Sequence, residues 1–257
     1  MKDGGLMQSF TVTNMPGWMR KRQRYFGKTL SQRFVFNSAG HTSCPTPDAW
    51  LAQFEQVDCA IAITISSQLS GSMNSALAAR DMALEKNPDK KIVILDSLST
   101  GPEVLLCVKE IERLIRQGLS FDDIAAHARN FLQKTKILFA LSSFDNLIKN
   151  GRIHRLTGML AKALGIWGIG SGSDEGKITF ESKARGAKKV VQTLVSTMKE
   201  HGFIGGNVAI SHCDNLALAQ TLKNSILDIW ENTSIEILPT RGLCSYYAER
   251  GGLIISY

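Results

Sequence analysis

The chain has 257 residues, of which 44% are apolar and 21% are charged, so it can form a packed core and is not a disordered chain. The absence of any apolar run of about 18 residues predicts no membrane span, and the start MKDGGLMQSF lacks the pattern of a secretory signal. Five cysteines without a C-x-x-C pair indicate reduced thiols, and we expect a cytoplasmic protein.

The formal net charge of +7 lies almost entirely near the N-terminus. Residues 1–41 carry seven Lys and Arg residues and a single acid, and the run RKRQR occupies 20–24. Because no aromatic or base-reading residues interleave with this run, we expect a solvated segment and no nucleic-acid partner. A regulatory module that uses the run as a docking arm is the alternative.

From residue 59 onward, apolar strands alternate with amphipathic helices. The pattern predicts strands at 59–65, 91–97 and 136–143, and helices at 72–87, 102–117 and 121–134. Pro102 stands at a first helical position, Gly118 follows the last residue of the same helix, and Ser120 is an N-cap followed by two aspartates. Such alternation predicts a parallel sheet with helices on its faces.

The second part of the chain has a different rhythm. Asn150 and Gly151 form a turn, after which an amphipathic helix runs into the glycine-rich strand at 165–170. Further strands are predicted at 177–184, 207–212, 234–240 and 252–257, with helices at 187–201 and 215–232. Hairpins mixed with crossovers predict a mixed or antiparallel sheet.

The segment ISSQLSGS presents four hydroxyls where a buried strand passes into a helix. Ligands of open α/β sheets bind at that edge, and free N–H groups at a helix N-terminus favour an anion such as a carboxylate or phosphate. Ser66 and Ser67 come first in the turn, and Gly71 closes it. Plain helix capping is the alternative. Neither G-x-S-x-G nor a P-loop is present.

Four other short motifs carry candidate binding residues. HTSCPTP presents Thr42 and Ser43 on a loop pinned by two prolines, and a simple turn before the next helix is the alternative. Arg152 follows the turn at 150–151, Arg185 precedes a helix N-terminus, and Arg241 stands on a loop with Ser245, Tyr246 and Tyr247. An arginine at a helix N-terminus opposes the helix dipole and favours an anionic ligand or partner. No second pair completes a metal site.

These motifs occur in the order that is typical of one family. The chain reads TSCPTP at 42–47, SSQLSG at 66–71, LDS at 95–97, GRI at 151–153 and RGAKK at 185–189. In this order the chain resembles the DegV family of bacterial fatty-acid-binding proteins, from about residue 41 to the end. Any one motif is weak, whereas five in register are specific.

The resemblance implies an α/β fold of two domains with a lipid between them. Residues 1–150 would form an N-terminal domain with a parallel sheet and flanking helices. Residues 151–257 would form a C-terminal domain with a mixed six-stranded sheet and helices. Family members bind a long-chain fatty acid such as palmitate, stearate or oleate, need no cofactor or metal, and are not themselves enzymes.

The resemblance also implies roles for residues. The acyl carboxylate would be held by Thr42 and Ser66, with Ser67 as a further contact. Arg152, Arg185, Ser43 and Gly71 would contact the lipid or a partner, and Arg185 is tied to the partner. That partner is the catalytic subunit of a fatty-acid kinase, which converts the presented carboxylate to an acyl-phosphate for phospholipid synthesis. Transient contact of the protein with a membrane is a further alternative.

Two departures from the family pattern stand out. Arg241 occupies the place where T-H-x-G-P-G has its histidine, and a permanent cation would pair firmly with a carboxylate. The departure leaves a carrier of another lipid or anion, without a kinase, as an alternative. Residues 1–40 are divergent or lack the usual first strand, although FTVTN is a faint match.

The apolar tail of the ligand needs an apolar lining. We expect this lining in the residues after the G-R-I motif: Leu156, Met159, Leu160, Leu164, Ile166 and Ile169. The competing hypothesis is a small-molecule enzyme, either a serine esterase or a phosphotransferase, that uses the Ser66 turn. It requires a base, for which His41 and His212 are the candidates, and Asp214 follows His212 in sequence.

Overall fold

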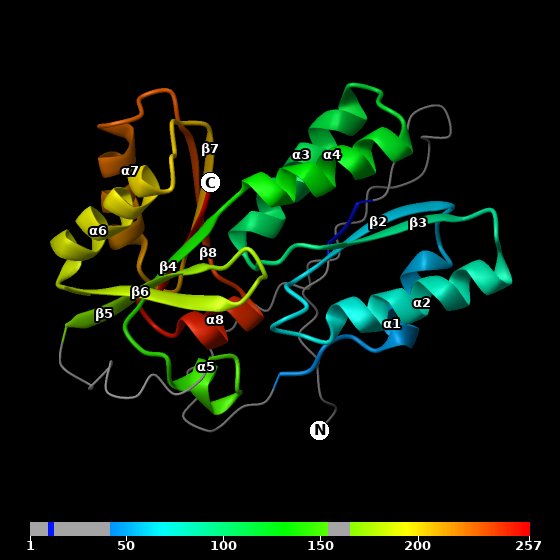
Figure 1. The fold of residues 1–257 in the computed structure, drawn as a ribbon, viewed down its shortest axis with the longest axis horizontal. Coiled ribbons are helices and arrows are strands. Elements are labelled where there is room, and N and C mark those ends of the chain that lie inside the picture. Colours follow the sequence, from blue (N-terminus) through cyan, green and yellow to red (C-terminus); the bar gives the residue numbers. More distant parts are fainter. Residues whose placement is uncertain (1–9, 13–41, 154–164) are drawn as a thin grey trace.

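A computed structural model describes residues 10–12, 42–153 and 165–257. Its elements form two groups, one around a three-stranded sheet and one around a six-stranded sheet (Figure 1). The α/β fold class predicted from the sequence is confirmed. Among the described residues, none of the helices has the length and apolar character needed to span a bilayer.

The first sheet has the order β1-β2-β3. Its strands are β1 (Phe10–Val12), β2 (Cys59–Thr64) and β3 (Lys91–Asp96). Strands β2 and β3 run parallel as predicted, and β1 pairs antiparallel with β2, so the divergent N-terminal region contributes one short strand.

Helices cover both faces of this sheet (Figure 1). One face packs on α1 (Pro47–Phe54) and α2 (Ser72–Lys86), and the other on α3 (Pro102–Arg116) and α4 (Phe121–Lys134). The predicted N-cap is confirmed, because the Ser120 hydroxyl accepts a hydrogen bond from the Asp123 N–H at 3.2 Å. Strands buried on both faces account for the continuous apolar runs in the sequence.

The second sheet has the order β6-β5-β4-β9-β7-β8. Its strands are β4 (Ile137–Leu141), β5 (Ile166–Gly172), β6 (Ile178–Arg185), β7 (Asn207–His212), β8 (Ser234–Pro239) and β9 (Leu253–Ser256). Strands β7 and β8 are parallel and the other pairs are antiparallel, so the predicted mixed sheet is confirmed.

Strand β4 lies in a different place from the one that the sequence predicts. The alternation of strands and helices placed residues 136–143 in the parallel sheet. The structure places β4 in the six-stranded sheet, antiparallel to both β5 and β9. All five of its residues are apolar and buried, so their pattern identifies a central strand without indicating its sheet. Strand β4 therefore precedes the proposed domain boundary at residue 150 in sequence, yet belongs to the second sheet.

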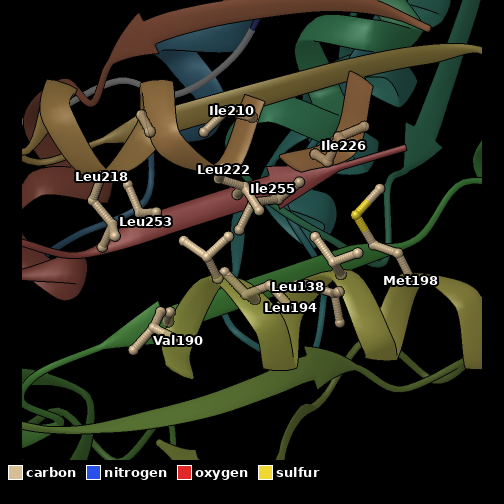
Figure 2. Packing of buried hydrophobic residues seen from close by; sticks show 14 of the residues in the cluster. Leu138, Val190, Leu194, Met198, Ile210, Leu218, Leu222, Ile226, Leu253 and Ile255 are labelled. Carbon is tan, nitrogen blue, oxygen red and sulfur yellow. The ribbon is translucent and has the colours of Figure 1, made fainter. Parts of the chain in front are cut away.

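The two faces of the six-stranded sheet differ. One face packs on α6 (Ala187–Glu200) and α7 (Leu216–Leu227), and Figure 2 shows the leucine, isoleucine, valine and methionine side chains that meet there. Leu138 and Ile255 belong to this core, whereas their neighbours Ile137 and Ile254 belong to the cluster on the opposite face. Near that opposite face lie α5 (Asp145–Lys149) and α8 (Gly242–Ala248). This second face holds the cavity described below.

Glu103 is a buried acid that ties the β3–α3 loop to the start of β4. Its side chain is 3% exposed and accepts hydrogen bonds from the Ser99 and Thr135 hydroxyls, each at 2.7 Å. Burial raises the pKa of this carboxyl group, against the two hydrogen bonds and the charge of Lys136, which lower it.

We expect the stability advantage of the wild type over Glu103→Gln to depend on pH. Because the folded protein raises the pKa of Glu103, it binds the proton more tightly than the unfolded chain does, so the contribution grows as pH falls. The free energy of unfolding of the wild type should increase relative to that of the variant as pH falls through the raised pKa, and the increase should be complete below the ordinary pKa of 4.5. This increase should amount to about 1.4 kcal/mol for each unit by which folding raises the pKa. Urea denaturation of both proteins across this range measures it, and a difference independent of pH would contradict it.

Candidate functional site

An apolar cavity lies between the inner face of the six-stranded sheet and the loops that follow β2 and β3. Its empty volume is about 540 Å³, counting its open mouth. Strand β4 supplies Ile137, Phe139 and Leu141, every second residue, because alternate side chains of a strand point to the same face. The other lining residues come from the two loops, from β5, β6, the turn between them and β9, and from α5 and α8: Leu69, Leu98, Ser99, Thr100, Leu147, Ser171, Gly172, Gly176, Lys177, Ile178, Tyr247, Ala248 and Ile254.

The lining differs from the one that the sequence predicts. Leu156, Met159, Leu160 and Leu164 lie outside the described residues. Ile169 is buried in the core beneath α6 and α7, and Ile166 is not among the residues that line the cavity. The contribution of β4 was missed because five consecutive apolar residues show no alternation in the sequence.

The loop HTSCPTP and the serine turn, 24 residues apart in sequence, lie against each other. The Ser75 hydroxyl in α2 donates a 2.6 Å hydrogen bond to the Pro45 carbonyl. A Cβ atom on Gly71 would lie 3.4 Å from the Cys44 sulfur. Two motifs that the sequence could only place in order are therefore neighbours, with Ser43 exposed beside them.

Thr42 reaches across to the C-terminal helix. Its hydroxyl shares a 2.7 Å hydrogen bond with the Tyr247 hydroxyl of α8, and Tyr247 lines the cavity. The prediction that Tyr247 lies on a loop is wrong, because residues 242–248 form α8. The pairing was beyond sequence reasoning, since 205 residues separate the two hydroxyls.

Ser66 is fully buried and its hydroxyl already has partners. It donates a 2.6 Å hydrogen bond to the Gly176 carbonyl in the β5–β6 turn and accepts one from the Gln68 N–H at 3.2 Å. The backbone N–H of Ser66 donates to the Ser99 carbonyl at 2.8 Å. In this structure Ser66 therefore joins the end of β2 to the second sheet.

Ser67 is exposed, and an acid of the neighbouring strand holds its backbone. The Asp96 carboxylate accepts from the Ser67 N–H at 3.2 Å and from the Leu98 N–H at 3.0 Å. Ser70 and Ser72 pair with each other, with their hydroxyls 3.0 Å apart. Ser67 is thus the exposed serine of the turn, and a ligand could reach it from solvent.

The three candidate arginines have different surroundings. Arg152 is half-buried, and its Nε donates to the Leu69 carbonyl at 3.2 Å, so the G-R-I motif lies beside the serine turn. Arg241 is exposed at the N-cap of α8, and no hydrogen bond of its side chain to another described residue is seen. Arg185 is exposed at the far end of β6, about 24 Å along the strand from Ile178 at the cavity. The structure thus brings Arg152 to the serine turn and leaves Arg185 remote from it.

The residues of the competing enzyme hypothesis have other partners. His212 Nδ1 accepts a hydrogen bond from the Asn215 N–H at 3.2 Å, and burial lowers the pKa of this imidazole against the opposing charge of Asp214. Asp214 pairs with Arg250 at 3.0 Å. His41 lies outside the described residues. Within the part of the chain that the structure describes, no three His, Cys, Asp or Glu side chains are grouped to hold a metal ion.

Comparison with known proteins decides the family. The DegV family model matches residues 28–257, which is most of the chain. The chain belongs to the DegV family. The match begins earlier than residue 41, where the sequence motifs begin, and thus includes part of the divergent N-terminal region.

Relatives in this family are similar along most of their length. A DegV domain-containing protein of Streptococcus pyogenes serotype M1 is 40% identical over 228 residues, which cover 89% of this chain and 81% of the relative. The crystal structure of a DegV family protein from Eubacterium eligens loaded with heptadecanoic acid is 36% identical, with a TM-score of 0.83, over 86% of this chain and 80% of that one. The Streptococcus pneumoniae Fatty Acid Kinase (Fak) B3 protein loaded with linoleic acid is 42% identical, with a TM-score of 0.81, over 84% and 76%.

Proposed function

We propose that the protein is a non-catalytic carrier that binds one long-chain fatty acid, such as palmitate, stearate or oleate, in the cavity over β4. The observation that carries the proposal is the contrast within this cavity, since its wall is nearly all apolar and a hydroxyl pair, Thr42 and Tyr247, stands beside it. Two solved structures similar to this chain hold heptadecanoic and linoleic acid.

The tail would supply most of the affinity. Burying about 14 methylenes gains on the order of 11 kcal/mol at about 0.8 kcal/mol each. The carboxylate loses its water on binding, which costs several kcal/mol unless donors replace the water. We assign the role of these donors to the hydroxyls of Thr42, Tyr247 and Ser67. Arg241, at the N-cap of the helix that carries Tyr247, adds a positive charge.

A kinase partner is part of the proposal. The name of the Streptococcus pneumoniae structure, Fatty Acid Kinase (Fak) B3 protein, favours a carrier that presents the carboxylate to a separate catalytic subunit. Arg185, Lys188 and Lys189 are exposed around the N-terminus of α6, where basic side chains oppose the helix dipole. Such a basic cluster suits an acidic surface on the partner. The cytoplasmic location of the protein stays a prediction from the sequence.

Chemical extraction tests the proposal directly. The purified protein is denatured and extracted, and mass spectrometry is expected to find long-chain fatty acids in amounts comparable to the protein. After delipidation, the protein should take up palmitate or oleate again. Absence of fatty acid from repeated preparations, with no uptake on incubation, would contradict the proposal. Ester hydrolysis lost in Ser66→Ala would favour the enzyme hypothesis instead.

A further inference from the structure

Alternate residues of β5 are glycines, and each makes room for a bulky neighbour. A Cβ atom at Gly168 would lie 2.5 Å from the Phe144 ring. At Gly170 it would lie 2.2 Å from the Thr179 carbonyl oxygen and 2.4 Å from the Phe139 ring. At Gly172 it would lie 2.7 Å from Cγ2 of Ile137. Separations below 3.0 Å essentially never occur for a real Cβ, so these side chains lie where β5 has no side chains of its own.

Gly172 and Ile137 both line the cavity and mark one of its ends. Ile137 is the first residue of β4, and Leu141, the last, lies about 13 Å away along the strand. The chain then enters α5, which packs beside α8, the helix of Tyr247. The hydroxyl pair Thr42–Tyr247 therefore stands near the Leu141 end of β4. Ile137 stands at the opposite end, next to the β5–β6 turn that Ser66 contacts.

The surroundings of Gly172 determine how an added methyl group would act. Apart from its chain neighbours, the only atom of the described residues within 4 Å of its Cβ position is Cγ2 of Ile137. The backbone of Gly172 is not in the left-handed region, so alanine is compatible with its conformation. Strands β4 and β5 block movement of the Ile137 side chain toward the sheet. A methyl group added at residue 172 would therefore displace this side chain into the cavity.

We propose that the contact between Ile137 and Gly172 sets the length of the acyl chain that the cavity accepts. This inference rests on the proposed function and adds that the carboxylate lies at the Thr42–Tyr247 end and the methyl end at Ile137. Gly172 lets Ile137 lie flat on the sheet and keeps the methyl end open. A larger residue at 172 closes that end, and a smaller residue at 137 extends it.

The test compares chain lengths in a set of delipidated variants. Dissociation constants for myristate, palmitate and stearate are measured by calorimetry for the wild type, Gly172→Ala, Ile137→Ala and the double variant. In Gly172→Ala the affinity for stearate relative to myristate should fall about fourfold for each methylene that no longer fits. Ile137→Ala should shift the ratio toward stearate, and the double variant should restore a ratio near that of the wild type.

A matched control separates chain-length selection from general loosening of the sheet. Leu138→Val alters the next residue of β4, whose side chain lies in the core beneath α6 and α7 (Figure 2). It should lower stability and leave the stearate-to-myristate ratio unchanged. If Gly172→Ala does not fold, the Ile137→Ala variant alone tests the inference. A stearate-to-myristate affinity ratio that does not move toward stearate in this variant would overturn it.

The outcomes distinguish this inference from the proposed function. A wild-type protein that binds none of the three fatty acids overturns both. A wild type that binds them, with ratios unchanged in Gly172→Ala and Ile137→Ala, overturns the assignment of chain length to this contact and leaves the carrier proposal standing.

Discussion

Valine in place of Thr42 is expected to weaken fatty-acid binding by about 10- to 100-fold, because a hydrogen bond to a charged group contributes about 1.5–3 kcal/mol. The Thr42 hydroxyl is half-buried and pairs with Tyr247 at 2.7 Å. Valine keeps the shape of threonine and removes the hydroxyl. Calorimetry measures the affinity of the delipidated variant for palmitate. The affinity for fatty acids of every chain length should fall by the same factor.

Thr46→Val is the matched control on the same loop. Thr46 is exposed and caps α1 by accepting a hydrogen bond from the Ala49 N–H at 3.3 Å. Loss of this cap should cost about 1 kcal/mol of stability and leave affinity unchanged. Equal affinities of Thr42→Val and the wild type would remove Thr42 from the proposed head-group site.

Alanine in place of Gly176 is expected to lower the free energy of unfolding by about 3–4 kcal/mol. Gly176 has a φ of +81°, where an L-residue costs about 1–2 kcal/mol. Its Cβ would also lie 2.4 Å from the Ser66 hydroxyl and 2.9 Å from Cα of Leu98. The substitution would therefore push the β5–β6 turn away from the ends of β2 and β3. Urea denaturation measures the loss.

Gly118→Ala isolates the backbone part of that effect. Gly118 has nearly the same φ, +79°, and apart from its chain neighbours no described residue has an atom within 4 Å of its Cβ position. We expect this variant to lose only about 1–2 kcal/mol. If the two alanine variants lost the same stability, the close approach of the β5–β6 turn to Ser66 and Leu98 would contribute nothing, and the described contact between the two sheets would be wrong.

Local sequence signals succeeded where the chemistry is local. Pro102, Ser120 and Gly118 mark helix ends that the structure confirms, because capping and turn preferences act within one turn of backbone. The motif order also identified the family correctly. Strand β4 shows the limit of this reasoning, since its uniformly apolar residues fit a central strand of either sheet.

The candidate site shows the same division. Thr42 and Ser66 are predicted to belong to one site, and their motifs do lie together. The sequence does not indicate that the Ser66 hydroxyl donates to Gly176, 110 residues away, or that Thr42 meets Tyr247. Both contacts cross from one sheet to the other, and no local pattern encodes them.

The sequence by itself determined that this chain is an α/β protein of the DegV type, with hydroxyls gathered where strands end. Those features depend on backbone propensity and on residues near one another in the chain. Only the tertiary structure decided which face of β4 lines the cavity, which hydroxyls form hydrogen bonds across the two sheets, and where Ile137 rests against Gly172. Such contacts join residues far apart in sequence, and they form only when the two sheets pack, because burial is a property of the folded chain as a whole.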